Sequence, residues 1–222
     1  MKLSRLFTAG LIIIAAIAFS SAMSAKAVAL PDPDLDDRLA DAPAQISAVL
    51  AGGCFWGIEE VYQHVRGVVN AVSGYSGGPA KSAKYDLVST GTTGHAESVK
   101  ITYDPSKVSY GQLLRVFFSV AHDPTQRGGQ GPDTGPQYRS VIFYSSDRQQ
   151  AIAKAYMGQL RDAHVFGKKD ITTDLVPLTA FYEAEEYHQD YAARNPYQPY
   201  IMMWDLPKVD ALKKEFPQLY VK

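Results

Sequence analysis

The chain has 222 residues, with 22 Lys and Arg against 23 Asp and Glu, so its formal net charge is −1. This length allows one domain with a substantial core, or at most two small ones. The balanced charge and the lack of a basic stripe argue against a nucleic-acid-binding protein. Hydrophobic residues make up 46% of the chain, which is ordinary for a globular protein.

Residues 1–27 have the pattern of a cleavable secretory signal. Lys2 and Arg5 form a short positive region, an apolar run covers 6–19, and small residues with an A-x-A pattern end near Ala27. The apolar run is shorter than the roughly 20 residues that a membrane span needs. We therefore expect an exported protein, periplasmic or secreted after cleavage; an uncleaved membrane anchor is the alternative.

A segment rich in Pro, Asp and Ala follows the predicted signal. This composition is typical of a poorly ordered linker, which we assign to residues 28–45. The rest of the chain, 46–222, is then predicted to be one catalytic domain.

The start of this domain has a strand, helix and strand pattern. The apolar run 46–51 predicts a buried strand, and helical spacing of apolar residues after Cys54 predicts a helix that ends at Gly67. Residues 68–72 predict a second strand. The three segments indicate a βαβ unit whose first turn presents Cys54.

Further elements alternate with two glycine-rich loop regions, 73–96 and 121–139. Ser109 is a candidate helix cap, and Ser146 with Gln149 has the spacing of a capping box. We expect strands at 99–103, 140–144 and 172–176, and helices at 109–120, 146–163, 183–191 and 206–216. The mixture indicates an α/β (α+β) domain, and a loop as long as 121–139 is typical of a functional site.

Cys54 is the only cysteine, so the chain cannot form an internal disulfide. A lone cysteine in an exported protein is either a buried inert thiol or a reactive one. Gly52 and Gly53 allow a tight turn and leave space above the sulfur. The start of a helix offers free N–H groups and a positive dipole end, and both favour the nucleophilic thiolate.

Groups near this turn suggest a chemistry. Phe55 and Trp56 could form an apolar pocket suited to a methyl or thioether group, although ordinary core packing is the alternative. Glu97, at the start of a strand, could be a general acid whose pKa is raised by burial, or simply a solvent-facing acid.

The glycine-rich loop regions carry other candidate groups. Tyr85, Asp133 and Tyr138 lie in these regions, where binding groups often occur. His95 could be a catalytic base, with a structural histidine as the alternative. With 14 tyrosines in the chain, no single one of them indicates a site.

Six motifs in order resemble the A-type peptide methionine sulfoxide reductases, across about 48–200. They are Gly53-Cys54-Phe55-Trp56-Gly57, Gly74-Tyr75-Ser76-Gly77-Gly78, Tyr85, Gly91-Thr92-Thr93-Gly94-His95-Ala96-Glu97, His122-Asp123-Pro124 and Gln137-Tyr138-Arg139-Ser140. The resemblance implies a two-layer α+β sandwich with a ferredoxin-like βαβ core. It also implies an enzyme that repairs oxidised proteins by reducing methionine S-sulfoxide, free or in proteins, to methionine.

The resemblance implies roles for matching residues. Cys54 would attack the sulfoxide sulfur and become a sulfenic acid, while Glu97 protonates or hydrogen-bonds the departing oxygen with help from Tyr85 and Tyr138. A thiolate cannot supply the proton that makes this oxygen a better leaving group. Phe55 and Trp56 would hold the ε-methyl group, and Asp133 would help to position the substrate.

The sequence departs from the family pattern in two places. The tail from Asn195 onward has none of the cysteines that resolve the sulfenic acid in many members, and the loop 127–132 also differs. An external thiol must therefore reduce Cys54. We expect no bound cofactor or metal, a monomer, and a thiol reductant such as thioredoxin, glutaredoxin or glutathione.

Rival hypotheses remain at this stage. A cysteine hydrolase or transferase would pair Cys54 with His95, His122 or His188. A thiol sensor or binding module would oxidise Cys54 without turnover. A metal site is a further alternative to a solvated helix face, with candidate ligands His188, Asp190, Glu185 and Glu186.

Overall fold

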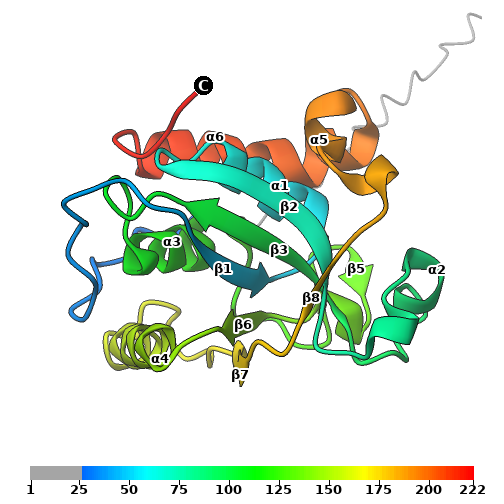
Figure 1. Ribbon diagram of the computed structural model, residues 1–222, viewed down its shortest axis with the longest axis horizontal. Coiled ribbons are helices and arrows are strands. Elements are labelled where there is room, and N and C mark those ends of the chain that lie inside the picture. Colours follow the sequence, from blue (N-terminus) through cyan, green and yellow to red (C-terminus); the bar gives the residue numbers. More distant parts are fainter. Residues whose placement is uncertain (1–26) are drawn as a thin grey trace, which may run out of the picture.

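A computed structural model describes residues 27–222, so most of the predicted signal segment lies outside the described residues. Its main feature is a six-stranded sheet with the strand order β7-β6-β1-β3-β2-β8 (Figure 1). These strands are β1 (Ile46–Ala51), β2 (Val68–Ser76), β3 (Ala96–Tyr103), β6 (Val141–Tyr144), β7 (Asp174–Pro177) and β8 (Phe181–Glu183).

Helices surround the sheet. They are α1 (Phe55–Gln63), α2 (Tyr85–Val88), α3 (Tyr110–Val116), α4 (Asp147–Asp162), α5 (Tyr191–Arg194) and α6 (Leu206–Glu215). A π-helical turn, Phe117–Ala121, continues α3, and another, Ile201–Asp205, leads into α6. Within residues 27–222, no helix combines the length and apolar character that a membrane crossing requires.

The four central strands have ferredoxin-like topology. Strands β1 and β2 both pair with β3 in antiparallel register, so they run parallel to each other and α1 connects them. Strand β6 pairs antiparallel with the other edge of β1. The resulting order β6-β1-β3-β2 corresponds to the order 4-1-3-2 of a ferredoxin-like sheet, which confirms the predicted fold class.

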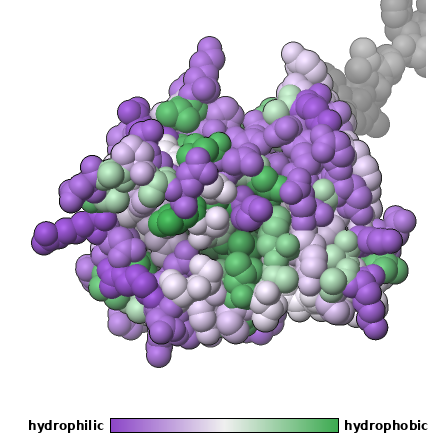
Figure 2. All heavy atoms as spheres, in the orientation of Figure 1, coloured by the Kyte–Doolittle hydropathy of each residue, from purple (hydrophilic) through white to green (hydrophobic). Residues whose placement is uncertain are grey.

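Both faces of β1 are buried from Ala48 to Ala51, which explains the four consecutive apolar residues there. Ala48 and Leu50 point into the larger core, which the helices share. Val49 and Ala51 alternate to the other face and pack in a smaller cluster. In Figure 2, hydrophobic residues gather across the middle of the viewed face, with hydrophilic residues around them.

Two predicted helix starts have different capping. At α3 the Ser109 side chain accepts from the Gln112 amide and the Gln112 side chain accepts from the Ser109 amide, so this is a full capping box. At α4 the Ser146 side chain accepts from the Gln149 amide, 3.2 Å away. The Gln149 side chain accepts from Ser145 instead, so the predicted box is only half formed.

The predicted helix at 183–191 is wrong. This segment contains the end of β8, a short 3₁₀ turn at Glu186–His188, and a break at Asp190 before α5 begins. Asp190 has φ of 52°, in the left-handed region, which interrupts helical hydrogen bonding. In this segment the contacts of the buried His188 side chain, rather than a helical spacing of apolar residues, set the conformation.

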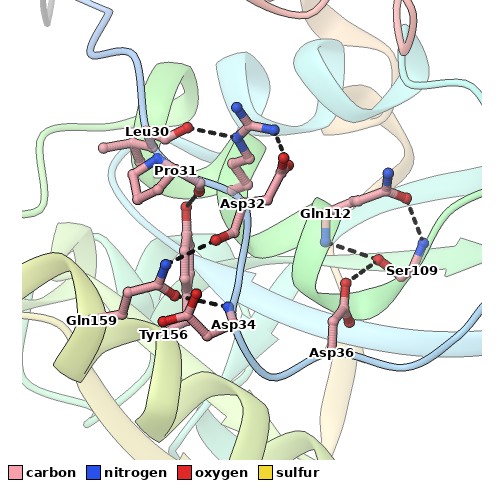
Figure 3. Close-up of polar contacts among 10 residues, drawn as sticks. Leu30, Pro31, Asp32, Asp34, Asp36, Ser109, Gln112, Tyr156 and Gln159 are labelled. Carbon is pink, nitrogen blue, oxygen red and sulfur yellow. Dashed lines mark hydrogen bonds and ion pairs between the residues drawn. The ribbon is translucent and has the colours of Figure 1, made fainter.

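The segment expected to be a poorly ordered linker instead packs along α3 and α4 (Figure 3). Leu30 is buried, with 3% of its surface exposed, and its carbonyl accepts from Arg115 Nε at 2.8 Å. Tyr156 donates to the Pro31 carbonyl at 2.9 Å, and Gln159 bonds the backbone of Asp32 at 2.8 Å. The backbone carbonyl groups of this segment thus accept hydrogen bonds from side chains of α3 and α4.

Asp36 fixes this segment to the start of α3. Its carboxylate accepts hydrogen bonds from the Ser109 hydroxyl and from the Gly111 amide, the latter at 2.8 Å. A carboxylate is favourable at a helix N-terminus, because free N–H groups and the helix dipole are positive there.

Candidate active site

The turn between β1 and α1 positions Cys54 at the N-cap of the helix. Gly53 has φ of +107°, and a Cβ on it would lie 2.7 Å from Gln130 Cγ. A Cβ on Gly52 would lie 2.8 Å from the His122 ring. Both glycines are therefore required by close packing, and the sulfur-bearing residue remains only 8% exposed.

Glu97 lies directly beside this turn. The Phe55 amide donates to Glu97 Oε2 at 3.1 Å, and only 2% of the glutamate surface is exposed. Burial raises the pKa of Glu97 to about 8, against a smaller lowering by the Phe55 N–H and with a further rise from Asp133. The carboxyl group therefore carries a proton at neutral pH, as a general acid must.

The resting state of Cys54 differs from the sequence expectation. Burial raises the pKa of the Cys54 thiol well above its ordinary value, and nearby Glu97 and Asp205 raise it further. The Trp56 amide opposes this effect but does not outweigh it. The predicted thiolate is therefore wrong for the substrate-free protein, because desolvation outweighs the helix N-terminus.

Two phenols and a carboxyl group complete the polar side of the site. Burial raises the pKa values of Tyr85 and Tyr138, and the charges of Glu97 and Cys54 raise both further. Both phenols remain O–H donors at neutral pH. Burial also raises the pKa of Asp133, despite a hydrogen bond from Tyr200.

Phe55 and Trp56, the other candidate residues, lie in a group of aromatic rings that we call the aromatic wall. The other members of the wall are His188, Tyr191 and Tyr200. The Trp56 ring stacks on Tyr191 with centroids 3.8 Å apart and planes 13° apart. The Trp56 indole donates to His188 Nδ1 at 3.2 Å, and Phe55 lies 5.0 Å from the same imidazole. Tyr200 meets the Trp56 ring edge-on. Phe55 and Trp56 are thus packed among aromatic rings, and Phe55 has only 1% of its surface exposed.

Sequence reasoning missed three of these wall residues, His188, Tyr191 and Tyr200. His188 was considered only as a partner of Cys54 or a metal ligand. The signal that could have identified them is the concentration of aromatic residues from 187 to 200, in a segment without glycine or an apolar strand pattern.

Glu185 is a second carboxylate near the site, and its hydrogen bonds have a structural role. It accepts from the Tyr75 hydroxyl at 2.8 Å and from the Tyr85 amide at 2.9 Å, so it holds the start of α2 against β2. Asp190 bonds Gln63, 2.6 Å away. In the described part of the chain no three His, Cys, Asp or Glu side chains form a metal-binding group. Three of the four candidate metal ligands, Glu185, Asp190 and His188, thus have other partners.

The candidate histidine bases are also engaged. His122 Nδ1 lies 3.0 Å from the Phe117 carbonyl and Nε2 lies 2.7 Å from the Ser140 hydroxyl, while burial lowers its pKa to about 4. His95 Nε2 bonds the Pro79 carbonyl at 3.1 Å. His122 therefore has no free ring nitrogen with which to take the Cys54 proton, as the hydrolase hypothesis would need.

A small cavity of about 30 Å³ opens beside Cys54. Its lining joins the glycine-rich loop to the C-terminal tail. The residues are Cys54, His122, Gln126, Gln130, Gly131, Pro132, Asp133, Tyr200, Trp204 and Lys208. Asp133 and Tyr200 of the site line this cavity, whereas Glu97, Tyr85 and Tyr138 do not.

Comparison with known proteins decides the family. The family model described as peptide methionine sulfoxide reductase matches residues 46–220. The chain belongs to this family. As a peptide methionine sulfoxide reductase of the A type, it is 58% identical over 179 residues to MsrA 2 of Mesorhizobium japonicum, covering 81% of this chain and 91% of that protein. It is 47% identical over 172 residues to an MsrA of Thermus thermophilus, covering 78% and 96%.

Solved structures agree with this assignment to the reductase family. Methionine sulfoxide reductase A of Corynebacterium diphtheriae has a TM-score of 0.60 and 32% identity, covering 83% of this chain and 93% of that one. Reduced Mxr1 from Saccharomyces cerevisiae has a TM-score of 0.62 and 33% identity, covering 72% and 94%. This reductase is therefore an oxidoreductase that reduces methionine sulfoxide in a thiol-dependent reaction.

Proposed function

We propose that Cys54 is the nucleophile and Glu97 the acid in the reduction of methionine S-sulfoxide. The observation that supports this proposal is the buried Glu97 carboxyl group, which accepts from the amide that follows Cys54 and has a pKa raised to about 8. A protonated acid beside a sulfur nucleophile matches what the sulfoxide oxygen needs in order to depart.

The reaction balances with one thiol and one sulfoxide. The Cys54 sulfur bonds to the sulfoxide sulfur while Glu97 protonates the oxygen. The S–O bond and the transient S–S bond to the substrate then break as an S–O bond forms on Cys54, so the hydroxyl group ends on Cys54. The products are the methionine thioether and a Cys54 sulfenic acid, with Cys54 oxidised by two electrons. Tyr85 and Tyr138 donate hydrogen bonds to the oxygen while its negative charge grows.

The aromatic wall binds the methyl end of the substrate. Trp56 offers an apolar surface above the buried Phe55 ring, and Tyr191 together with His188 holds the indole in place through stacking and a hydrogen bond. Asp133 then accepts a hydrogen bond from the substrate backbone, in addition to the one it receives from Tyr200. Substrates include oxidised proteins and free methionine sulfoxide.

An external thiol returns Cys54 to its reduced state, because the chain has one cysteine. Thioredoxin, glutaredoxin or glutathione can supply this thiol, and the enzyme needs no bound cofactor. We further propose that the protein acts as a monomer outside the cytoplasm, after residues 1–27 are removed as a signal peptide. The pattern of Lys2, Arg5 and the apolar run supports export, with a retained anchor as the alternative.

A single-turnover experiment tests the role of Cys54. Protein lacking residues 1–27 is mixed with a methionine sulfoxide peptide in the absence of thiol. We expect one methionine per chain and one sulfenic acid label, located at Cys54. Cys54→Ser should retain the folded circular dichroism spectrum and form no methionine. Appreciable methionine from Cys54→Ser would refute the mechanism, and obligatory Cys54–Cys54 dimers would refute the monomeric cycle.

A further inference from the structure

We propose that the two residues on either side of Tyr138 are positioning residues, which hold its phenol in place relative to the other groups that bind the departing oxygen; the inference rests on the proposed function. These neighbours are Gln137 and Arg139, at a short 3₁₀ turn. The other oxygen-binding groups are Tyr85, the first residue of α2, and Glu97, near the start of β3. Three separate segments thus carry the oxygen-binding groups, so their relative positions depend on contacts between the segments.

Arg139 connects the 3₁₀ turn to the start of β3. Its Nη1 donates to two carbonyl groups, that of Pro136 in the turn at 2.9 Å and that of His95 at 3.1 Å. Its Nη2 donates to the Gly94 carbonyl at 2.9 Å. Gly94 and His95 directly precede the strand that carries Glu97. One planar guanidinium group therefore bonds both the turn and the backbone that leads to the proposed acid, a geometry that the single ammonium group of a lysine does not reproduce.

Gln137 connects the same turn to α2. Its side chain is buried, with 5% of the residue exposed, and Nε2 donates to the Ser89 carbonyl at 3.2 Å. Ser89 is the C-cap of α2, and Tyr85 is its first residue. Glu185 accepts from the Tyr85 amide at the other end of this short helix. The helix is therefore held at both ends, and its C-terminal bond is to the turn that carries Tyr138.

Glycines leave the space in which these two side chains lie. A Cβ on Gly135 would collide with Gln137 Oε1, and a Cβ on Gly91 would lie 3.0 Å from the same oxygen. A Cβ on Gly77 would lie 3.1 Å from Arg139 Nη2. All three glycines belong to the glycine-rich loop regions. The two side chains are thus packed against the backbone of these loops, which gives their hydrogen bonds defined positions.

The rate of oxygen transfer should depend strongly on this arrangement. Groups that stabilise developing charge act only when they are held within about 0.5 Å of the productive geometry. A displacement of about 1 Å can lower a rate by roughly 10²-fold. Because Gln137 and Arg139 connect the turn to both other segments, loss of their bonds should slow the chemical step more than it weakens substrate binding.

Arg139→Met tests this role, because it removes the three hydrogen bonds and retains a long side chain. Arg115→Met is the control, since Arg115 also donates to a backbone carbonyl, that of Leu30 at 2.8 Å, in a segment outside the site. Single-turnover methionine formation is measured over a range of peptide concentrations, and stability is measured in urea. Both variants should lose stability. Only Arg139→Met should lower the maximal rate, by about tenfold, while the half-saturating peptide concentration stays within about twofold of the wild type.

A double-mutant cycle measures whether Arg139 acts through Tyr138. In Tyr138→Phe the hydroxyl group to be positioned is absent, so adding Arg139→Met should lower the maximal rate by less than about threefold. Arg139→Lys retains the charge but bonds fewer of the three carbonyl groups, so its rate should be intermediate. This second variant gives the same test if Arg139→Met does not fold.

Gln137→Met and Tyr85→Phe form a second cycle. Gln137→Met should lower the maximal rate by roughly threefold, and by less than that when Tyr85 lacks its hydroxyl group. Gln149→Met is the control, because Gln149 is also buried and its Nε2 donates to the Ser47 carbonyl at 2.8 Å, away from the site. A wild-type maximal rate in Gln137→Met would overturn the assignment of this residue.

Wild-type protein and Cys54→Ser are measured in the same assay. Failure of the proposed function would appear there, as a missing wild-type burst or as methionine formed without Cys54. Wild-type maximal rates in Arg139→Met and Arg139→Lys would instead overturn the positioning role alone. The same fold loss with and without the Tyr138 hydroxyl group, or an equal loss of rate in Arg115→Met, would also overturn it.

Discussion

Replacing Glu97 with Gln removes the proposed acid while retaining its known contact. The Gln side-chain oxygen can still accept from the Phe55 amide, which lies 3.1 Å from the carboxylate. The variant therefore separates loss of the proton from loss of local geometry. We expect methionine formation at pH 7 to fall by roughly 10²- to 10⁴-fold, the usual contribution of a general acid.

The raised pKa of Glu97 determines how strongly, and in which direction, the rate of methionine formation depends on pH. A carboxyl with pKa about 8 is mostly protonated at pH 7, whereas one at the ordinary 4.5 would be protonated in only about one molecule in 300. The active form needs protonated Glu97 together with Cys54 thiolate, although Cys54 has the higher pKa. The rate should therefore rise up to about pH 8, level off, and fall above the pKa of Cys54.

In Glu97→Gln only the Cys54 ionisation remains. The rate should continue to rise up to the pKa of Cys54 and then stay level, so the fall at high pH disappears. Single-turnover methionine release between about pH 6 and about pH 10 distinguishes the two profiles, because the wild type levels off at about pH 8 whereas the variant keeps rising. Glu60→Gln on α1, the helix that follows Cys54, is the control. The Glu60 carboxylate bonds His64 3.3 Å away, and this variant should retain the wild-type profile. A rate that also levels off at about pH 8 in Glu97→Gln would refute Glu97 as the acid.

Two further predictions follow from the contacts. Tyr138→Phe should slow methionine formation roughly 10- to 100-fold in single-turnover assays, because one donor to the oxygen is lost; an unchanged rate would remove this phenol from the mechanism. Asp36→Ala should lower the free energy of unfolding by about 1–2 kcal/mol in urea titrations, because the Ser109 and Gly111 donors lose their partner. The exposed Asp41→Ala is its control, and equal stability of the two variants would contradict a stabilising role for this segment.

Much of the fold was predictable because its signals are local. The buried strand β1, the tight turn at Gly53 and the helix after Cys54 follow from apolar runs, glycine conformation and helical spacing over a few residues. Where local signals conflicted with distant contacts, prediction failed. The segment around Asp190 has helical composition but is interrupted by a left-handed residue, and the segment around Asp36 is stabilised by helices more than 70 positions away.

The sequence by itself determined the chemistry available to this protein: a single sulfur nucleophile at a helix start, a carboxyl group and no internal thiol to reduce it. Only the tertiary structure decided the protonation states of these groups. Glu97 contacts the Cys54 turn across 42 positions of sequence, and the Trp56–His188 bond spans 132. Burial at such contacts raises the pKa of both Glu97 and Cys54, because removing a charged group from water costs free energy that no local pattern specifies.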